Sequence, residues 1–456
     1  MFRSLILLSL VLPACSDEEP TDTQDAVPEI DRDETSTKPQ WSTTVLEEDG
    51  FGLHARLAVG PNDELGVAYF GVRATATEAC DELGVPEPPT KQEWELRYAY
   101  FDGSRWNSET VFSNPYVGEP PGLDFQFAPD GTPSIAVMHG PPVAPILFCG
   151  ASDVVLFQRD AGGQWSSSTA VTTSGQAATG EPGSDYGDVV GHWPGLAFAP
   201  NGDIGIMYKD VHSGGMQSDD FRRADLEYAR RRGGWSALPV LWGIGAGNYN
   251  RLLYDAESHP YVVFYNPSED VSSRVGIWIA RQMDESADWE TVQLFNNRTP
   301  SGPSAVFVDD AMYVAYYEAN LGYPQLAHCP DLTQFSDVSA WEQSDIGDSR
   351  YDEGYSPSLA SAASGRLGVA YYRCGRQSGG LGDCAFAEDA LVFAYRDGSA
   401  WTREVVDEGD MGLCGMSPSL GFDSSTTAWV AYRCESFDEE TQLLKTQLRV
   451  ARREKL

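Results

Sequence analysis

The segment from Ser356 to Trp401 shows the repeating pattern that decides the fold. Its apolar runs and turns read Ser-Pro-Ser-Leu-Ala at 356–360, Gly-Val-Ala-Tyr-Tyr at 368–372, Leu-Val-Phe-Ala-Tyr at 391–395 and Arg-Asp-Gly-Ser-Ala-Trp at 396–401. Short runs rich in Val, Tyr and Phe, separated by Gly, Asp and Ser, are typical of strands joined by turns. A fourth run, Trp-Thr-Arg-Glu-Val-Val, follows from 401. The segment therefore predicts a four-stranded antiparallel unit.

The same unit recurs along the chain, and a Trp that opens the outer strand marks each copy. The markers lie 52 to 70 residues apart, at Trp41, Trp106, Trp165, Trp235, Trp289, Trp341 and Trp401. The inner three runs of each unit are apolar on both faces, which suits a sheet packed between two neighbouring sheets. Seven such units predict an all-β, seven-bladed β-propeller over residues 41–456.

The two ends of the repeat region predict how the ring closes. The last unit ends at Leu448–Arg452, after its third strand, whereas residues 41–46 have the pattern of an outer strand with no unit before them. We expect this N-terminal strand to complete the last blade, because closure removes an open sheet edge that would otherwise invite aggregation.

The residues before the repeats resemble an export signal and a tether. Residues 1–14 carry one positive charge, Arg3, and an apolar run from Leu5 to Leu12, as secretory signals do. The Leu-Pro-Ala-Cys segment ending at Cys15 resembles the lipobox of bacterial lipoproteins, which implies a lipid anchor on Cys15, a membrane partner and a place in the cell envelope. Ser16 resembles the residue that follows the Cys in lipoproteins exported to an outer membrane. An ordinary signal peptide, with Cys15 incidental, is the alternative.

Residues 15–40 predict an acidic disordered tether. From 16 to 40 they contain nine Asp or Glu and no aromatic residue, so they cannot bury enough apolar surface to fold.

The turn before several marker Trp residues resembles the Asp-box of sialidase-like propellers. The copies are Phe101-Asp-Gly-Ser-Arg-Trp106, Arg159-Asp-Ala-Gly-Gly-Gln-Trp165 and Arg396-Asp-Gly-Ser-Ala-Trp401. Only the copy at 160–165 has the family's spacing from Asp to Gly to Trp. The resemblance implies a sialidase-like architecture, while a tight turn whose Asp accepts local backbone hydrogen bonds explains the same residues.

Connection lengths predict which end of the propeller carries a binding surface. Turns from first to second strand are short, whereas the second-to-third and fourth-to-first connections are long and variable and leave the blades at one common end. Alignment of the repeats puts Arg56 and Arg251 there, at the start of inner strands. The equivalent positions in the other units are Gly122, Gly195, Ser304, Ser358 and Ser419. Charged residues at the ends of second strands complete the candidate ligand-binding set, with His139, Asp210, Glu318 and Arg373.

The cysteines favour an oxidising compartment, because most of them fall in long connections of that same end. We expect the disulfides Cys374–Cys384, Cys414–Cys434 and Cys80–Cys149, with Cys329 as a buried thiol. The sequence contains no C-x-x-C pair and no His at ligand spacing, so metal binding by these cysteines is not expected.

Composition and motifs leave two functions of different class. A net charge of −37 argues against nucleic acid as a partner, and no intact catalytic or cofactor-binding motif is present. The first function is a surface-anchored lipoprotein whose propeller binds a protein or glycan at the long-loop end. The alternative is a glycan-cleaving enzyme, hydrolase or lyase, in which Arg56, Arg251 and Arg373 surround a carboxylate and Asp210 and Glu318 act as acid and base.

Overall fold

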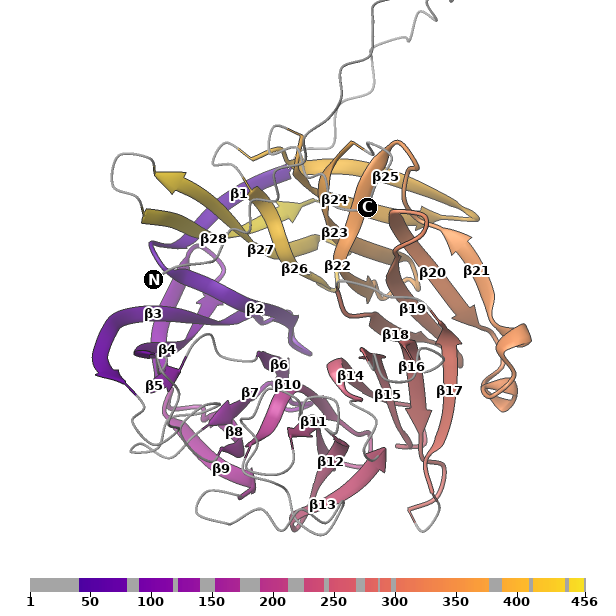
Figure 1. The fold of residues 1–456 in the computed structure, drawn as a ribbon, viewed down its shortest axis with the longest axis horizontal. Helices are drawn as coiled ribbons and strands as arrows, with labels where there is room; N and C mark the ends of the chain where they lie inside the picture. Colours follow the sequence, from indigo (N-terminus) through magenta and orange to yellow (C-terminus); the bar gives the residue numbers. More distant parts are fainter. Residues whose placement is uncertain are drawn as a thin grey trace, which may run out of the picture. The chain divides into compact units, whose positions relative to one another are not determined.

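The computed structural model places seven four-stranded sheets in a ring around a central axis (Figure 1). The chain divides into two units, Met1–Lys38 and Pro39–Leu456, and all described residues belong to the second. They are 41–79, 90–117, 122–139, 152–172, 189–211, 225–241, 246–267, 275–285, 288–296, 301–376, 388–409, 413–438 and 443–454. The predicted signal peptide (1–14) and the tether with Cys15 (15–40) lie outside them.

Six blades are built from consecutive antiparallel strands, named from the innermost outward. Blade I contains β2 (Phe51–Val59), β3 (Leu65–Ala79), β4 (Thr90–Phe101) and β5 (Trp106–Val117). Blade II contains β6 (Leu123–Phe127), β7 (Pro133–His139), β8 (Asp153–Arg159) and β9 (Trp165–Val171). Blade III contains β10 (Val189–Phe198), β11 (Ile204–Val211), β12 (Asp225–Arg232) and β13 (Gly234–Leu241).

The next three blades follow the same order. Blade IV contains β14 (Asn248–Tyr254), β15 (Pro260–Asn266), β16 (Gly276–Arg281) and β17 (Glu290–Phe295). Blade V contains β18 (Ser304–Val308), β19 (Ala311–Glu318), β20 (Tyr323–Cys329) and β21 (Glu342–Asp345), with the short 3-10 helices η4 (Leu332–Gln334) and η5 (Val338–Ala340) before β21. Blade VI contains β22 (Tyr351–Ser361), β23 (Leu367–Arg376), β24 (Ala390–Asp397) and β25 (Ala400–Asp407).

Blade VII joins the two ends of the propeller, as the sequence predicted. It contains β26 (Leu413–Phe422), β27 (Ala428–Asp438) and β28 (Leu443–Arg453), and its outer strand is β1 (Trp41–Glu48). The strands β1 and β28 pair antiparallel, with Trp41 opposite Arg453 and Val45 opposite Arg449. The predicted seven-bladed fold and its closure are therefore confirmed.

The marker Trp residues seal each blade against the blade before it. Trp41 of blade VII lies with its ring 5.3 Å from that of Phe393 in blade VI, and Trp165 of blade II lies 5.4 Å from Tyr98 in blade I. Aromatic pairs at these separations add packing energy beyond the area they bury. The recurrence of Trp thus follows from the need to close every interface between neighbouring sheets.

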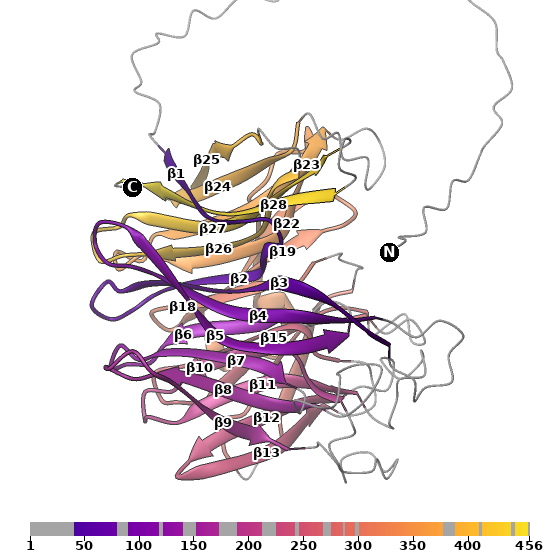
Figure 2. The same ribbon diagram turned by 90° about the vertical axis from the view of Figure 1, so that its left-hand side faces the viewer.

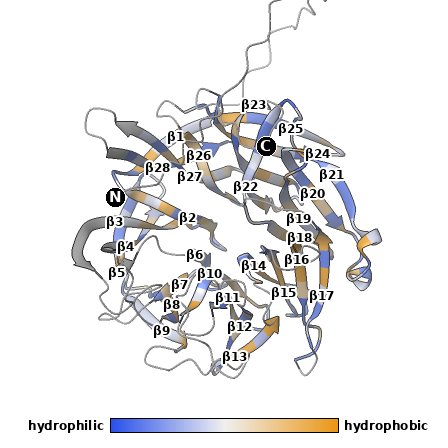
Figure 3. Cartoon of the chain, viewed as in Figure 1, coloured by the Kyte–Doolittle hydropathy of each residue, from blue (hydrophilic) through white to orange (hydrophobic). Residues whose placement is uncertain are grey.

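The second and third strands form the buried layers between blades. Their hydrophobic stretches recur around the whole ring (Figure 3), and Tyr69, Tyr208, Tyr371 and Tyr432 on second strands are fully buried.

Among the described residues, no helix is long and apolar enough to cross a membrane.

The strand directions separate the two ends of the ring, which Figure 2 shows from the side. Inner strands begin at the end where the second-to-third and fourth-to-first connections leave the blades, and we call this the loop end. The opposite end, the turn end, carries the first-to-second turns. Trp41 lies at the turn end, because it pairs with Arg453 at the finish of a third strand.

Asp residues of the short turns before outer strands act locally. Asp102 Oδ1 accepts hydrogen bonds from the backbone N–H groups of Ser104 and Arg105, and Asp160 Oδ1 accepts one from Gln164 N over 2.8 Å. The hydrogen bond from Ser104 Oγ, followed by the backbone bond from Arg105, lowers the pKa of Asp102. The Asp-box-like positions therefore stabilise turns.

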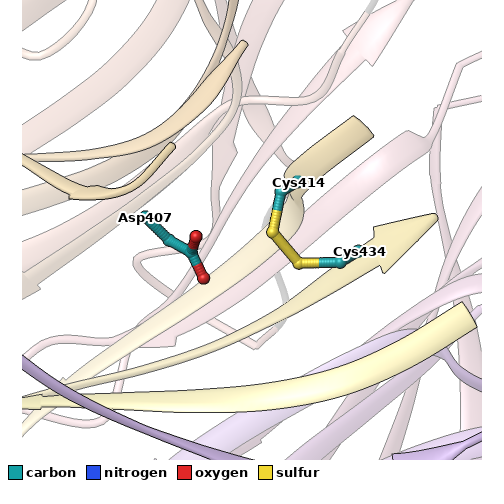
Figure 4. A group of neighbouring side chains, drawn as sticks. All are labelled: Asp407, Cys414 and Cys434. Carbon is teal, nitrogen blue, oxygen red and sulfur yellow. A yellow bond between two sulfur atoms is a disulfide. The ribbon is translucent and has the colours of Figure 1, made fainter. Parts of the chain in front are cut away.

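One predicted disulfide lies within the described residues. Cys414 and Cys434 are directly opposite on β26 and β27 and are joined, beside the carboxylate of Asp407 (Figure 4). Cys329 is a buried free thiol in a third strand, as expected. Cys374 is disulfide-bonded, but Cys80, Cys149 and Cys384 lie outside the described residues, so the other two pairs stay predictions.

Candidate functional site

A repeated bulge shapes the inner strands at the loop end. In five blades a Gly with positive φ is followed two residues later by a non-glycine residue that also has positive φ. The pairs are Gly52 and His54, Gly191 and Trp193, Gly247 and Tyr249, Gly354 and Ser356, and Gly415 and Ser417. The register of the inner strand shifts at each of these places.

Side chains at the second position of the bulge are held in a strained backbone. Trp193 has φ 46° and Tyr249 has φ 54°, and a bulky residue in this region is disfavoured by about 1–3 kcal/mol. Bulges redirect side chains and are frequent beside active sites. Here they turn these side chains toward the axis of the ring, where they line a cavity.

At the position just after the bulge, and at the equivalent position of the two blades without a bulge, a ring of side chains ties neighbouring blades together. Ser304, Ser358 and Ser419 each accept a hydrogen bond from a backbone N–H of the next blade's inner strand, at 2.8 to 3.0 Å. Asp124 does the same for Leu196 N over 2.8 Å. The equivalent residues in the remaining blades are Arg56, Gly195 and Arg251, none of which offers a side-chain acceptor.

This pattern corrects the sequence alignment in blade II. The position equivalent to Arg56 is Asp124, because Asp124 pairs with Ala136 just as Arg56 pairs with Ala68. The sequence alignment had predicted Gly122, two residues earlier, at this position. The inner strand of blade II is only five residues long and has no bulge, so a Gly does not mark the same position there as in the bulged blades.

An axial cavity of about 260 Å³ lies inside this ring, and all seven blades contribute to it. Its two halves differ. Blades I to IV supply larger side chains, including His54, Arg56, Trp193, Tyr249, Asn250 and Arg251. Blades V to VII supply only small residues, namely Ser301, Gly302, Pro303, Ser356, Pro357, Ser417 and Pro418. The half formed by blades V to VII therefore leaves space, and the half formed by blades I to IV supplies the charged, polar and aromatic side chains.

Two guanidinium groups give this cavity a positive wall in an acidic protein. Arg56 Nε lies 4.0 Å and Arg251 Nη1 3.7 Å from the same oxygen of Asp124. Burial and the neighbouring Arg251 lower the pKa of Arg56 to about 9, so it stays protonated at neutral pH. One carboxylate thus faces two cations at distances longer than a good charged hydrogen bond.

Aromatic rings and one amide complete this half of the cavity. The rings of Trp193 and Tyr249 lie 5.3 Å apart. Asn250 is 1% exposed, and its Nδ2 donates to Gly247 O over 3.2 Å. Its Oδ1 has no hydrogen-bond partner among the described residues. The wall therefore combines two cations, two aromatic faces and an amide oxygen.

The structure brings together only two of the six predicted ligand-binding residues, Arg56 and Arg251. His139 lies between blades, with its ring 4.5 Å from Phe112 and 6.3 Å from Phe157, and burial lowers its pKa. Asp210 is fully buried on β11, opposite Asp225 on β12. Neither His139 nor Asp210 lines the cavity.

Glu318 and Arg373 also have local roles away from the cavity. The carboxylate of Glu318 accepts hydrogen bonds from Asn320 Nδ2 and Leu321 N, at 2.9 and 2.7 Å, and so holds the turn after β19. Arg373 Nε donates to Glu388 O over 3.0 Å, and its guanidinium carbon lies 4.7 Å from the centre of the Tyr351 ring.

Sequence reasoning missed His54, Trp193 and Tyr249 as cavity residues. The signal was present, since each follows a Gly by two positions just before an inner strand. A strand with regular alternation would point these side chains elsewhere, so only the bulge reveals their direction.

Two groups of side chains at other places have donor atoms close enough for a metal ion. Among the described residues they are Asp407 with Cys414 and Cys434, and Asp255 with Glu257 and His259. The first is a disulfide beside a carboxylate that already binds Arg449 Nη1 over 3.0 Å. In the second, His259 Nδ1 is 2.8 Å from Asp255 Oδ2.

Comparisons with known proteins concern the fold alone. No protein-family model matches the sequence, and no curated protein matches it. Among solved structures, a protein of unknown function from Dyadobacter fermentans is similar, with 10% identity, 91% of this chain and 99% of that chain covered, and a TM-score of 0.45.

Two enzymes are similar to the same extent. The NanB sialidase from Streptococcus pneumoniae has 10% identity, with 89% of this chain and 68% of that chain covered and a TM-score of 0.44. The alpha-L-arabinofuranosidase arb93a from Fusarium graminearum has 14% identity, with 75% and 92% covered and a TM-score of 0.41. The seven-bladed propeller itself follows from the strand pairing, and its similarity to sialidases and other enzymes is at low sequence identity.

Proposed function

We propose that the protein is a binding module whose axial cavity takes one acidic sugar residue at the end of a glycan. The observation that carries this proposal is the pair Arg56 and Arg251, which share the single carboxylate of Asp124. They lie on one side of the cavity, and the opposite wall consists of small residues that leave space for a ligand. Arginine binds carboxylates through two parallel hydrogen bonds, and aromatic faces such as Trp193 and Tyr249 offer contact area for a sugar ring.

The size of the cavity supports a single end group as ligand. Its volume of about 260 Å³ is slightly below the range of about 300–1,000 Å³ typical of sites for drug-sized ligands. The cavity lies at the loop end, so a longer glycan bound there would continue past the long connections. A protein ligand that inserts an acidic side chain is the competing outcome of the test below.

A glycan-cleaving enzyme is less well supported. Glycoside hydrolysis generally needs two carboxyl groups, one on each side of the bond. None of the described residues that line the cavity carries a carboxylate, and Asp124 is engaged with both arginines and with Leu196 N. The predicted acid and base, Asp210 and Glu318, lie elsewhere.

Binding of glucuronate, with glucose as the neutral match, tests the proposal directly. Charged hydrogen bonds contribute about 1.5–3 kcal/mol, so Arg251→Met should weaken glucuronate binding by about 10-fold to 100-fold. Arg373→Met is the matched control and should leave affinity unchanged. Equal affinity for glucose and glucuronate, or an unaffected Arg251→Met variant, contradicts the proposal. Release of products from uronate-containing oligosaccharides would favour the enzyme instead.

We also propose that the protein is exported and anchored through Cys15 in a bacterial envelope, on the resemblance of residues 1–15 to a lipoprotein signal. The described chain begins with Trp41 at the turn end, whereas the cavity lies at the loop end. Incorporation of a labelled fatty acid in cells should depend on Cys15 and vanish in Cys15→Ser. Persistent labelling of that variant would exclude this anchor.

A further inference from the structure

A buried lysine lies directly behind the aromatic wall of the cavity. Lys209, on β11, is 1% exposed. Its Nζ donates a hydrogen bond to Asn248 Oδ1 over 2.7 Å and lies 5.4 Å from the centre of the Trp193 ring. Asn248 immediately precedes Tyr249, so one side chain contacts both segments that carry the aromatic wall.

The packing around Lys209 is tight and spans two blades. It lies opposite His192 on β10 and Leu226 on β12. From blade IV, Gly247 approaches so closely that a Cβ there would lie 3.4 Å from the Cβ of Lys209. A Gly at this position leaves the room that the lysine side chain occupies between the two inner strands.

Among the described residues, the titratable groups near Lys209 fall on two faces of the sheet. His192 faces Lys209, and burial together with Lys209 lowers its pKa to about 3, so it stays neutral. Asp210 and Asp225 are paired with each other on the opposite face, where Tyr208 also donates to Glu227 Oε2 over 2.8 Å. Within the described part of blade IV, Asn248 is the polar residue that contacts Lys209.

We propose that Lys209 is a positioning residue for the axial cavity, which holds Trp193 and the Asn248–Tyr249 segment in place and adjusts anion affinity by gaining or losing its proton. Only the effect on anion affinity rests on the proposed function. The positioning of Trp193 and the Asn248–Tyr249 segment concerns the protein without ligand.

Protonation of Lys209 changes both contacts in a definite direction. Burial lowers the pKa of Lys209 to about 7, so the ammonium form gains population as pH falls through neutrality. The ammonium strengthens the attraction to the Trp193 ring and adds a positive charge behind the arginine wall. Above neutrality the amine keeps its hydrogen bond to Asn248, but the cation–π contact and the charge are lost.

Fluorescence of the ligand-free protein tests the positioning role. The difference between the wild type and Trp193→Phe isolates the emission of Trp193, and we expect it to change with a midpoint near pH 7 in the wild type. Lys209→Met should show no such transition. NMR of protein labelled with 13C-lysine gives the same answer without a substitution, because one lysine signal should titrate near pH 7 while exposed lysines titrate near about 10.4. Absence of that signal would overturn the inference.

Affinity for glucuronate tests the second part. From about pH 6 to about pH 8, wild-type affinity should fall several-fold, and Lys209→Met should bind with the weaker affinity throughout. His54 lines the same cavity, so the series is repeated in the His54→Gln background to exclude a contribution from its imidazole. A titrating Lys209 with no glucuronate binding would refute the proposed function but not the positioning role. Binding with the same pH profile in wild type and Lys209→Met would refute the effect on affinity.

Discussion

The hydroxyl of Ser419 accepts a hydrogen bond from the backbone N–H of Leu57 over 2.8 Å and so ties the last blade to the first. Ser419 Oγ also donates to Leu57 O over 3.3 Å. Both residues come from inner strands, and their bonds belong to the same ring of contacts that Ser304, Ser358 and Asp124 form elsewhere.

Ser419→Ala should destabilise the protein by about 1–3 kcal/mol, because it leaves a buried N–H without its acceptor. Chemical denaturation measures the change in the free energy of unfolding. Ser167→Ala, on the exposed face of β9, is the control and should shift it by less than about 0.5 kcal/mol. Equal effects of the two substitutions would show that the ring of contacts does not stabilise the fold.

Glu404→Gln should weaken the closure of the ring. Glu404 accepts two hydrogen bonds of 2.7 Å from Arg453 and one of 3.0 Å from Trp41 Nε1, and both charged side chains are at most 10% exposed. Loss of one partner of a buried ion pair destabilises by about 3–5 kcal/mol. The exposed pair of Arg452 and Glu454 supplies the control, and Glu454→Gln should change stability by less than about 1 kcal/mol. A loss no larger than that of the control would contradict the prediction.

Stability should fall with rising pH because of Asp389. Burial raises the pKa of this carboxyl to about 6, above its value of about 3.9 in an unfolded chain. Between these values the folded state binds more protons than the unfolded state, so stability decreases as pH rises through the window. Asp389→Asn removes the titration, and the difference in Tm between variant and wild type should change between about pH 4 and about pH 7. A constant difference would exclude a raised pKa.

Removal of the Cys414–Cys434 disulfide should destabilise blade VII. The two residues are 20 apart in the sequence, and crosslinks of similar span contribute about 3 kcal/mol. The double variant Cys414→Ala with Cys434→Ala should therefore have a lower Tm than the oxidised wild type. If the Tm is unchanged, the crosslink does not stabilise the closing blade.

The architecture could be predicted because it is encoded in repeated local patterns. Trp41, Trp106 and their equivalents mark outer strands, and the unpaired pattern at residues 41–46 indicated the closing strand. Each of these signals depends on residue type and spacing alone. The fold therefore followed without knowledge of any side-chain direction.

The site was only half predictable, because a bulge reverses the directions that regular strands would give. Arg56 and Arg251 lie just after the bulge and were found by alignment. Trp193 and Tyr249 lie within it, so their orientation follows from a positive φ that the sequence signals only through a preceding Gly. Residues such as Glu318 have polar side chains that satisfy their own turns, and a sequence does not distinguish such a role from ligand binding.

The pairing of β1 with β28 also sets an order of events during synthesis. Glu48 and Gln447, which are hydrogen-bonded across these strands, are separated by 399 positions in the chain. Contacts between such distant segments form late and slowly. The first strand of the propeller to leave the ribosome is thus the last to find its partner, and until then it has an unpaired edge that a chaperone or a second nascent chain can reach.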